Sequence, residues 1–201
     1  MSIRDCTVIA VEGTHATGKT TLVHALTSHY RERGIHVTCT GEPARISPFM
    51  EEIVLHHVGT FDVVAELDAL GAQLTAQLRA ARHHHLLICD KTLINVVAYA
   101  RMLLPPKDRD VLEAMTNLCR ATSHLYDAVF YPVDTFNPRQ HGDRFRDKVA
   151  DQQDELDELL RAELKAAGLN PIVIPPGRKT AARVEWISAR LATEGLISTL
   201  T

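Results

Sequence analysis

The stretch GTHATGKT, residues 13–20, decides the fold of this chain. It has the spacing G-x-x-x-x-G-K-[ST] of a phosphate-binding loop. The apolar run CTVIAV, residues 6–11, comes just before it, as expected for a parallel strand that is covered on both faces. After the loop, apolar residues recur at helical spacing as far as Gly34. The sequence therefore supplies the strand, loop and helix that a nucleotide-binding loop requires.

The residues of this loop suit the binding of a nucleotide's phosphates. Gly13 and Gly18 allow backbone conformations closed to other residues, so that N–H groups and the following helix N-terminus can face the phosphates. Lys19 is expected to reach the β- and γ-phosphates, and the hydroxyl of Thr20 to bind Mg²⁺. The predicted cofactor-binding residues are Gly13, Thr14, His15, Ala16, Thr17, Gly18, Lys19, Thr20 and Thr21.

Further strand-like runs alternate with helical patterns along the rest of the chain. They occupy residues 35–40, 86–90, 127–133 and 171–175. Such alternation implies parallel pairing through right-handed crossovers. We therefore predict one α/β domain over residues 1–201, with a doubly wound five-stranded parallel sheet, helices on both faces, and ligands at the carboxyl ends of the strands. The longest helix, about residues 62–82, is predicted from an apolar stripe of Val64, Leu67, Leu70, Leu74 and Leu78.

Two strand ends carry candidate catalytic residues. Asp90 ends the third strand, where its carboxylate can hold Mg²⁺ or cap the helix that follows. After the second strand, Glu42 could accept a proton from an attacking hydroxyl, and Arg45 could bind substrate phosphate. A turn with a solvated ion pair is the other interpretation of Glu42 and Arg45.

The polar segment of residues 134–148 is the candidate lid. It carries Arg139, Arg144 and Arg146 within a long polar connection. Phosphoryl transfer needs charge stabilisation on the transferred group and exclusion of water, and mobile arginines supply both. Arg144 is the first candidate, and a solvated basic loop is the alternative interpretation.

Composition and charge limit the partners and the location. The net charge of −3 and the pI near 6.4 do not indicate nucleic acid as a partner. No stretch approaches the ~18 consecutive apolar residues of a membrane span, and the N-terminus lacks the pattern of a signal peptide. We therefore expect a cytoplasmic protein without membrane contact, whose cysteines are reduced.

The chain resembles the nucleoside and nucleotide kinases among P-loop proteins. VEGTHATGKTTL (residues 11–22) is similar to the loop of thymidylate kinases, and TGEPAR (residues 40–45) to their T-R-E-P turn. LLICDKTLINVVAYAR (residues 86–101) is similar to their strand that ends in Asp-Arg and to the helix after it. A closer similarity is to small ATP-binding proteins grouped with the nicotinamide riboside kinase domain, whose loops read like G-T-H-x-T-G-K-T-T. Their D-G-x-R stretch resembles HGDRFRD (residues 141–147), so the resemblance covers nearly the whole chain.

This resemblance implies a P-loop kinase of the nucleotide kinase type, with ATP and Mg²⁺ on the loop. A small-molecule acceptor would bind between the strand ends, the long helix and the lid. The resemblance implies catalytic roles for Lys19, Asp90, Glu42 and Arg144, and places Thr20 and Asp90 at the metal. Arg45 would be a cation on the acceptor side.

Two residues depart from the thymidylate kinase pattern. His15 stands where those enzymes have a carboxylate or another polar residue on the acceptor side. Lys91 replaces the arginine of Asp-Arg, which keeps the charge but loses the bidentate fork, and it remains a candidate substrate-binding residue. Gln73 is another candidate, because with Gln77 it could hydrogen-bond a base edge from the long helix. Both glutamines could equally be helix-surface residues.

The predicted reaction is transfer of the γ-phosphoryl group of ATP to a nucleoside or nucleoside monophosphate. A regulatory P-loop ATPase is one alternative, and a kinase of a sugar, an antibiotic or a modified base is the other. A guanine-specific switch should show N-K-x-D, which the sequence lacks. The sequence leaves open the identity of the acceptor, ATP or GTP as donor, and a homodimer as the assembled state.

Overall fold

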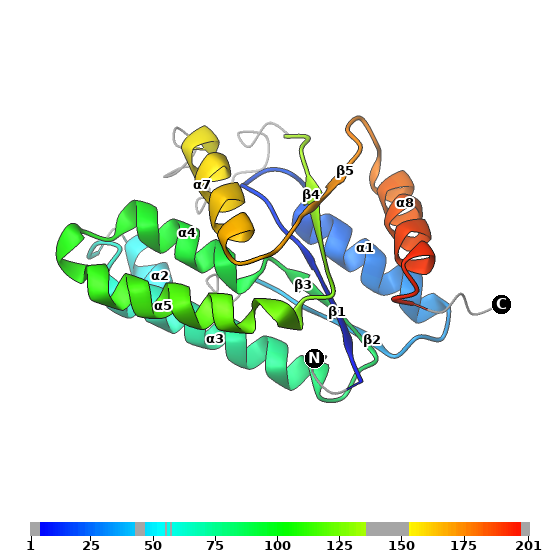
Figure 1. Ribbon diagram of the computed structural model, residues 1–201, viewed down its shortest axis with the longest axis horizontal. Helices are drawn as coiled ribbons and strands as arrows, with labels where there is room; N and C mark the ends of the chain where they lie inside the picture. The colour runs from blue at the N-terminus through cyan, green and yellow to red at the C-terminus, as the bar shows by residue number, and fades with distance from the viewer. Residues whose placement is uncertain (1–4, 43–46, 55, 57, 136–152, 198–201) are drawn as a thin grey trace.

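The computed structural model describes residues 5–42, 47–54, 56, 58–135 and 153–197. Within them, five strands form one sheet in the order β2-β3-β1-β4-β5 (Figure 1). Every neighbouring pair of strands is parallel. The strands are β1 Thr7–Val11, β2 Val37–Thr40, β3 Leu86–Asp90, β4 Ala128–Pro132 and β5 Ile172–Ile174.

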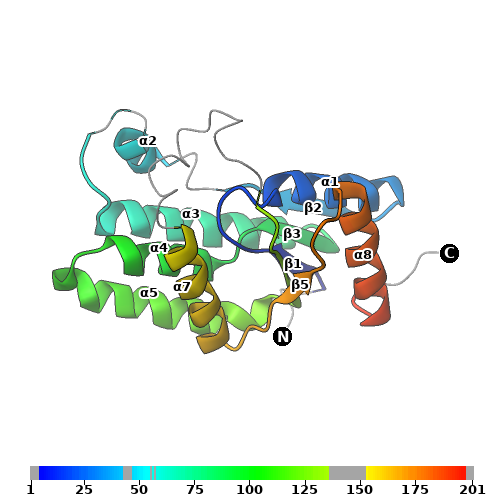
Figure 2. The ribbon, with the colours of Figure 1, turned by 90° about the horizontal axis from the view of Figure 1, so that it is seen from above.

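Helices cover both faces of this sheet (Figures 1 and 2). On one face lie α1 (Lys19–Glu32) and α8 (Thr180–Thr193); on the other lie α3 (Val63–Ala81), α4 (Leu93–Leu103), α5 (Arg109–Thr122) and α7 (Gln153–Ala166). The short helix α2 (Pro48–Val54) contacts α3, and 3₁₀ turns occupy Pro106–Asp108 and Ser123–Leu125. The predicted doubly wound fold is confirmed. In the described part of the chain, no helix combines the length and apolarity that crossing a membrane takes.

The central strand shows why the core has two halves. Side chains alternate between the faces of a strand. Val8 and Ala10 of β1 therefore join the core under α3, α4, α5 and α7, whereas Ile9 and Val11 join the core under α1 and α8. A run that is apolar at every position is what a strand buried on both faces needs.

The register of the sheet brings the predicted strand-end residues to one edge. Val11, just before the phosphate loop, pairs with Asp90, and Thr40 of β2 pairs with Cys89. Because parallel strands point the same way, their carboxyl ends meet at the same edge. The loop of residues 13–20, Glu42 and Asp90 all leave the sheet there.

The apolar stripe that predicts α3 is only in part its buried face. Leu70 is buried, but Val64, Leu67 and Leu78 are 52%, 45% and 42% exposed. The buried residues of α3 are Ala65, Glu66, Ala69, Leu70, Gln73, Gln77 and Ala81. The alanines of the buried face allow α3 to pack closely against its neighbours. The apolar periodicity of the sequence does not distinguish this face from the adjacent stripe of larger side chains, which is exposed in part.

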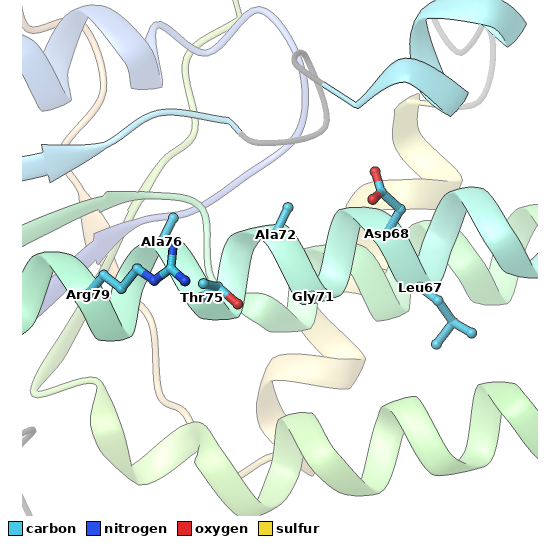
Figure 3. A pocket seen from close by; sticks show the side chains of 7 residues that line it. All are labelled: Leu67, Asp68, Gly71, Ala72, Thr75, Ala76 and Arg79. Atoms are coloured by element: carbon cyan, nitrogen blue, oxygen red, sulfur yellow. The ribbon is translucent and has the colours of Figure 1, made fainter.

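The outer face of α3 carries a shallow groove (Figure 3). Its lining residues are Leu67, Asp68, Gly71, Ala72, Thr75, Ala76 and Arg79. All of them belong to α3, and none is a residue of the phosphate loop or a predicted site residue. The groove therefore shares no lining residue with the pocket at the phosphate loop.

Candidate active site

The phosphate loop joins β1 to α1 through left-handed backbone conformations. The φ angle is 140° at Gly13 and 78° at Gly18, where a residue with a side chain is strained. Ala16 also has a positive φ, of 59°. Gly18 is the N-cap of α1, so the free N–H groups of the first helical turn lie at the loop. This arrangement is the anion-binding geometry that the motif predicts.

Lys19, the first residue of α1, is buried within the loop. Its Nζ donates hydrogen bonds to the carbonyl oxygen of Thr14 and, across 3.5 Å, to Oγ1 of Thr17. Burial, and then the positive charge of Lys91, lowers the pKa of Lys19 from 10.5 to about 8. Phosphate oxygens at the loop would replace these neutral acceptors with charged ones, which bind an ammonium group more strongly.

Thr20 and Asp90 form the candidate Mg²⁺ site. Thr20 Oγ1 donates a hydrogen bond to Asp90 Oδ2 across 2.6 Å. Asp90 is 2% exposed, and its Oδ1 has no hydrogen-bond partner among the described residues. A buried carboxylate oxygen without a partner is costly, whereas Mg²⁺ takes one or two protein oxygens together with waters and phosphates. The two side chains fit such an ion. Within the described ranges, no group of three or more His, Cys, Asp or Glu side chains is placed to hold a metal.

Glu12 is the main residue of the site that sequence analysis missed. It is fully buried and lies between β1 and Gly13. Its Oε1 accepts hydrogen bonds from the N–H of Gly13 and from Nδ2 of Asn95, both at 2.8 Å. Its Oε2 accepts from the N–H and the hydroxyl of Thr92 at 2.7 and 2.6 Å. Since Thr92 is the N-cap of α4, Glu12 ties the phosphate loop to that helix, and Asp90 is not the cap.

Glu42 and Lys91 form an ion pair beside the loop. Lys91 Nζ lies 2.5 Å from Glu42 Oε1, and both side chains are largely buried. The ammonium also lies 5.4 Å from the ring centroid of Tyr99, whose hydroxyl is hydrogen-bonded to Nε2 of His15. Burial by itself would lower the pKa of Lys91, but Glu42 and Tyr99 raise it well above its usual value, so the ammonium stays charged.

One pocket connects this ion pair with the nucleotide loop. Its lining residues are His15, Ala16, Gly18, Lys19, Thr20, Thr21, Glu42 and Lys91. The structure thus brings the candidate base Glu42 and the candidate substrate residue Lys91 next to the residues predicted to bind phosphate and metal. His15 and Tyr99 link the loop to α4 on the same side.

Gln73 occupies a different place from the predicted one. It is buried, and its Nε2 donates to the carbonyl oxygens of Lys91 and Thr92 at 3.2 and 3.1 Å. Gln77 is buried as well, so neither glutamine is a helix-surface residue. Buried backbone carbonyls need donors, and the turn after β3 receives them from α3. Instead of reading a base edge, Gln73 bonds to the backbone of this turn.

The residues at both ends of the segment that contains the candidate lid are hydrogen-bonded to the phosphate loop, one of them through Arg183. Asp134 accepts a hydrogen bond from Nη2 of Arg183 at 2.6 Å, and Nη1 of the same buried arginine donates to the carbonyl oxygen of Thr17 at 3.2 Å. At the other end, Gln153 Nε2 donates to the carbonyl oxygen of His15 at 3.0 Å. No motif in the sequence indicates these contacts, which join residues far apart in the chain.

The arginines predicted for the acceptor side and the lid lie outside the described residues. These are Arg45, Arg139, Arg144 and Arg146. Of the predicted lid, the structure describes residues 134 and 135. The roles of the four arginines stay predictions.

A family model described as AAA domain, AAA_28, matches residues 8–182. The match begins in β1 and ends in α8, so it includes the phosphate loop, Glu42 and Asp90. No curated protein matches the chain.

Solved structures of nucleotide kinases share the fold. NadR protein in complex with NR has a TM-score of 0.72 and 22% sequence identity, with 99% of this chain and 55% of that chain covered. NadR in complex with NAD and AMP-PNP has a TM-score of 0.66 and 21% identity, with 99% and 52% covered. Thymidylate kinase from Candida albicans has a TM-score of 0.64 and 13% identity, with 94% and 92% covered.

The chain spans about half the length of the NadR structures that it matches. The predicted resemblance to P-loop nucleotide kinases is confirmed at the level of the fold.

Proposed function

The chain belongs to the AAA_28 family of AAA domains, and we propose that it is an ATP-dependent kinase for a nucleoside or a nucleoside monophosphate. The observation that carries the proposal is the pocket that joins the phosphate loop to Glu42 and Lys91. A general base must lie within hydrogen-bond reach of the hydroxyl that it deprotonates. Glu42 lines the pocket that Lys19 also lines, which is where an acceptor kinase needs its base.

ATP and Mg²⁺ are the proposed donor and metal. The loop N–H groups and Lys19 would hold the β- and γ-phosphates, and Thr20 with Asp90 would hold the ion. The NadR structure with AMP-PNP supports an adenine nucleotide on this fold. Bound Mg²⁺ would neutralise charge on the phosphate oxygens during transfer.

In the proposed reaction, an acceptor oxygen, which is the hydroxyl oxygen of a nucleoside or a phosphate oxygen of a nucleoside monophosphate, attacks the γ-phosphorus in line with the bridging oxygen to the β-phosphate. A new phosphorus–oxygen bond forms, the bond to the bridging oxygen breaks, and ADP leaves. When the acceptor is a nucleoside, its hydroxyl proton passes to the carboxylate of Glu42, which lies on the wall of the same pocket. Lys19 offsets the charge on the transferred group, and Lys91 attracts oxygen atoms of the acceptor.

The remaining predicted residues complete this scheme as proposals. Arg45 is a second cation for the acceptor side. Arg144, with Arg139 and Arg146 as the other candidates, would cover the γ-phosphate when the segment of residues 134–148 closes as a lid of the single domain. A small-molecule acceptor containing a nucleoside is supported by the NadR complex with NR and by the thymidylate kinase among the structures of this fold.

The experiment that tests this function measures ADP release from ATP and Mg²⁺ with a panel of nucleosides and their 5′-monophosphates. We expect one acceptor to raise turnover far above the basal rate, and Lys19→Ala to abolish the stimulation. Glu42→Gln should lower the rate constant of transfer while ADP binding persists. Hydrolysis that no acceptor stimulates would instead favour a regulatory ATPase. ATP binding without turnover on any member of the panel would favour a sugar, an antibiotic or a modified base as acceptor.

Two further expectations accompany the proposal. A cytoplasmic location stays a prediction, and the sequence leaves a homodimer open. Sedimentation equilibrium of the chain over a range of concentrations checks the second.

A further inference from the structure

The backbone of Lys91 is held in a conformation that suits glycine. Its φ angle is 78°, and Lys91 and Ala16 are the non-glycine residues with positive φ in the described part of the chain. A side chain is strained in this left-handed region because its Cβ approaches the following carbonyl oxygen. Such strain persists only where the surroundings hold it, and it is frequent at functional sites.

Besides the hydrogen bond from the N–H of Thr92 to Glu12, four hydrogen bonds hold the backbone of this turn from two sides. The N–H of Lys91 donates to the carbonyl oxygen of Val11 at 3.1 Å. The carbonyl oxygen of Lys91 accepts from Gln73 Nε2 at 3.2 Å and from Gln77 Nε2 at 3.3 Å. Gln73 Nε2 also donates to the carbonyl oxygen of the next residue, Thr92, at 3.1 Å. Strand β1 thus holds the turn from one side and helix α3 from the other.

The orientation of the Gln77 amide is fixed by a chain of hydrogen bonds. The N–H of Leu93 donates to the hydroxyl of Tyr126 at 3.0 Å, and that hydroxyl donates to Gln77 Oε1 at 2.7 Å. Because the carboxamide oxygen already accepts from Tyr126, its nitrogen is the group that faces Lys91. Gln73 and Gln77 are both 4% exposed, so no bulk water competes for these bonds.

The strained conformation determines where the ammonium of Lys91 lies. The φ angle sets the direction of the Cα–Cβ bond relative to the preceding strand, so an ordinary negative φ would turn the side chain away from Glu42. In the observed conformation Nζ reaches Glu42 Oε1 at 2.5 Å and lines the pocket beside Lys19. Glycine would remove the strain, but it would also remove the charge.

We propose that Gln73 and Gln77 are positioning residues, which hold the left-handed turn at Lys91 and so direct its ammonium into the acceptor side of the pocket. The glutamines bind the backbone of the turn and act on the acceptor through Lys91. The kinetic part of this inference rests on the proposed kinase function, whereas the conformational part does not.

The conformational part is tested by NMR of the lysine side chains, which needs no substrate. A buried, ion-paired ammonium exchanges its protons with water slowly and gives a ¹⁵N-detected signal, and the signal of Lys91 is identified by its loss in Lys91→Gly. We expect Gln73→Met to abolish or strongly broaden this signal while circular dichroism stays that of a folded protein. Thr75→Val, on the exposed side of the same helix, should leave it unchanged. A sharp, unshifted Lys91 signal in folded Gln73→Met would overturn the proposal.

Gln77→Met is the second variant, for the case in which Gln73→Met does not fold. It removes one donor to Lys91 and leaves both bonds of Gln73. We expect faster proton exchange at the Lys91 ammonium in this variant. An exchange rate equal to that of the unchanged protein would again count against the proposal.

The kinetic part is tested by combining Gln73→Met with Lys91→Gly. We expect Gln73→Met alone to lower kcat/KM for the acceptor by about 10- to 100-fold, as for a misplaced catalytic-site group. In the Lys91→Gly background, Gln73→Met should lower kcat/KM for the acceptor by less than about twofold, because there is no ammonium left to position. An equal loss in both backgrounds would show that Gln73 acts without Lys91. If no acceptor is phosphorylated at all, the proposed function fails while the NMR result still decides the conformational part.

Discussion

The hydroxyl of Thr20 donates a hydrogen bond to the carboxylate of Asp90 at 2.6 Å, across 70 positions of the chain. The contact exists because Val11 pairs with Asp90 in the sheet, so that the loop after β1 returns over the end of β3. The second carboxylate oxygen of Asp90, Oδ1, is buried without a hydrogen-bond partner among the described residues. A hydroxyl and a carboxylate are therefore brought together in advance, at the edge where the phosphates of a nucleotide would lie.

Asp90→Asn tests whether this pair serves a metal. The amide keeps the size of the side chain but removes the charge that attracts Mg²⁺. We expect Mg²⁺-dependent turnover to fall by about 10- to 100-fold, as for other changes around a metal site. The midpoint of thermal unfolding should stay or rise, because an unpaired buried carboxylate is removed. Steady-state rates over a range of Mg²⁺ concentrations measure the effect, with exposed Asp110→Asn as control. Unchanged dependence on Mg²⁺ in Asp90→Asn would exclude Asp90 from the metal site.

The lowered pKa of Lys19 predicts a pH dependence of nucleotide binding. Below its pKa of about 8 the buried side chain carries its proton and attracts phosphate; above it, the free protein has lost that proton. Binding must then take up a proton, so Kd for ADP should rise by up to about tenfold per pH unit above pH 8. Calorimetric titration between pH 7 and pH 9.5 measures this rise.

Lys19→Arg is the control for this prediction. Its guanidinium stays charged throughout the range, so Kd should change little with pH even if binding is weaker overall. If Kd for ADP were equally independent of pH in the unchanged protein, the pKa of Lys19 would lie well above 8.

The parts of the fold that the sequence predicts depend on local pattern. The loop of residues 13–20 has its motif and its context within about 30 residues of sequence, and each strand is a separate apolar run. Asp90 and Glu42 are found in the same way, because the carboxyl ends of parallel strands share one edge of the sheet. These features need no knowledge of which side chains meet.

The parts that the sequence does not predict depend on which groups face one another across the chain. Glu12 precedes the first glycine of the loop, but its importance comes from Asn95 and Thr92, which lie about 80 positions away. Gln73 and Gln77 have the spacing of a base-reading pair, yet they bind the backbone carbonyl of Lys91, in the turn with a left-handed conformation. Periodicity describes one element, whereas these roles are set by the packing of two.

Two leucines of α3 test how this helix is turned about its own axis in the structure. Leu70 is 3% exposed and Leu67 is 45% exposed, although the same apolar stripe contains both. We expect Leu70→Ala to lower the free energy of unfolding by about 2–4 kcal/mol, because it leaves a cavity in the core. Leu67→Ala, the matched surface change, should cost no more than about 0.5 kcal/mol. Urea denaturation followed by circular dichroism gives both values. An equal loss of unfolding free energy in the two variants would contradict this orientation of α3. It would mean that the face of α3 that carries Leu67 is covered as well.

Glu12→Gln tests the tie between the phosphate loop and α4. The carboxylate accepts four hydrogen bonds in a fully buried position, and an amide can accept at only one of its two ends. Its NH₂ group would then face donors, either those of Thr92 or those of Gly13 and Asn95. We expect the free energy of unfolding to fall by about 3 kcal/mol, the scale of a buried group left unpaired, and ADP to bind more weakly because the loop is less firmly held. Denaturant unfolding and calorimetry measure the two effects, with exposed Glu113→Gln as control. If Glu12→Gln unfolds like the control but still weakens ADP binding, Glu12 acts on the nucleotide rather than on the fold; if neither quantity changes, the tie has no energetic role.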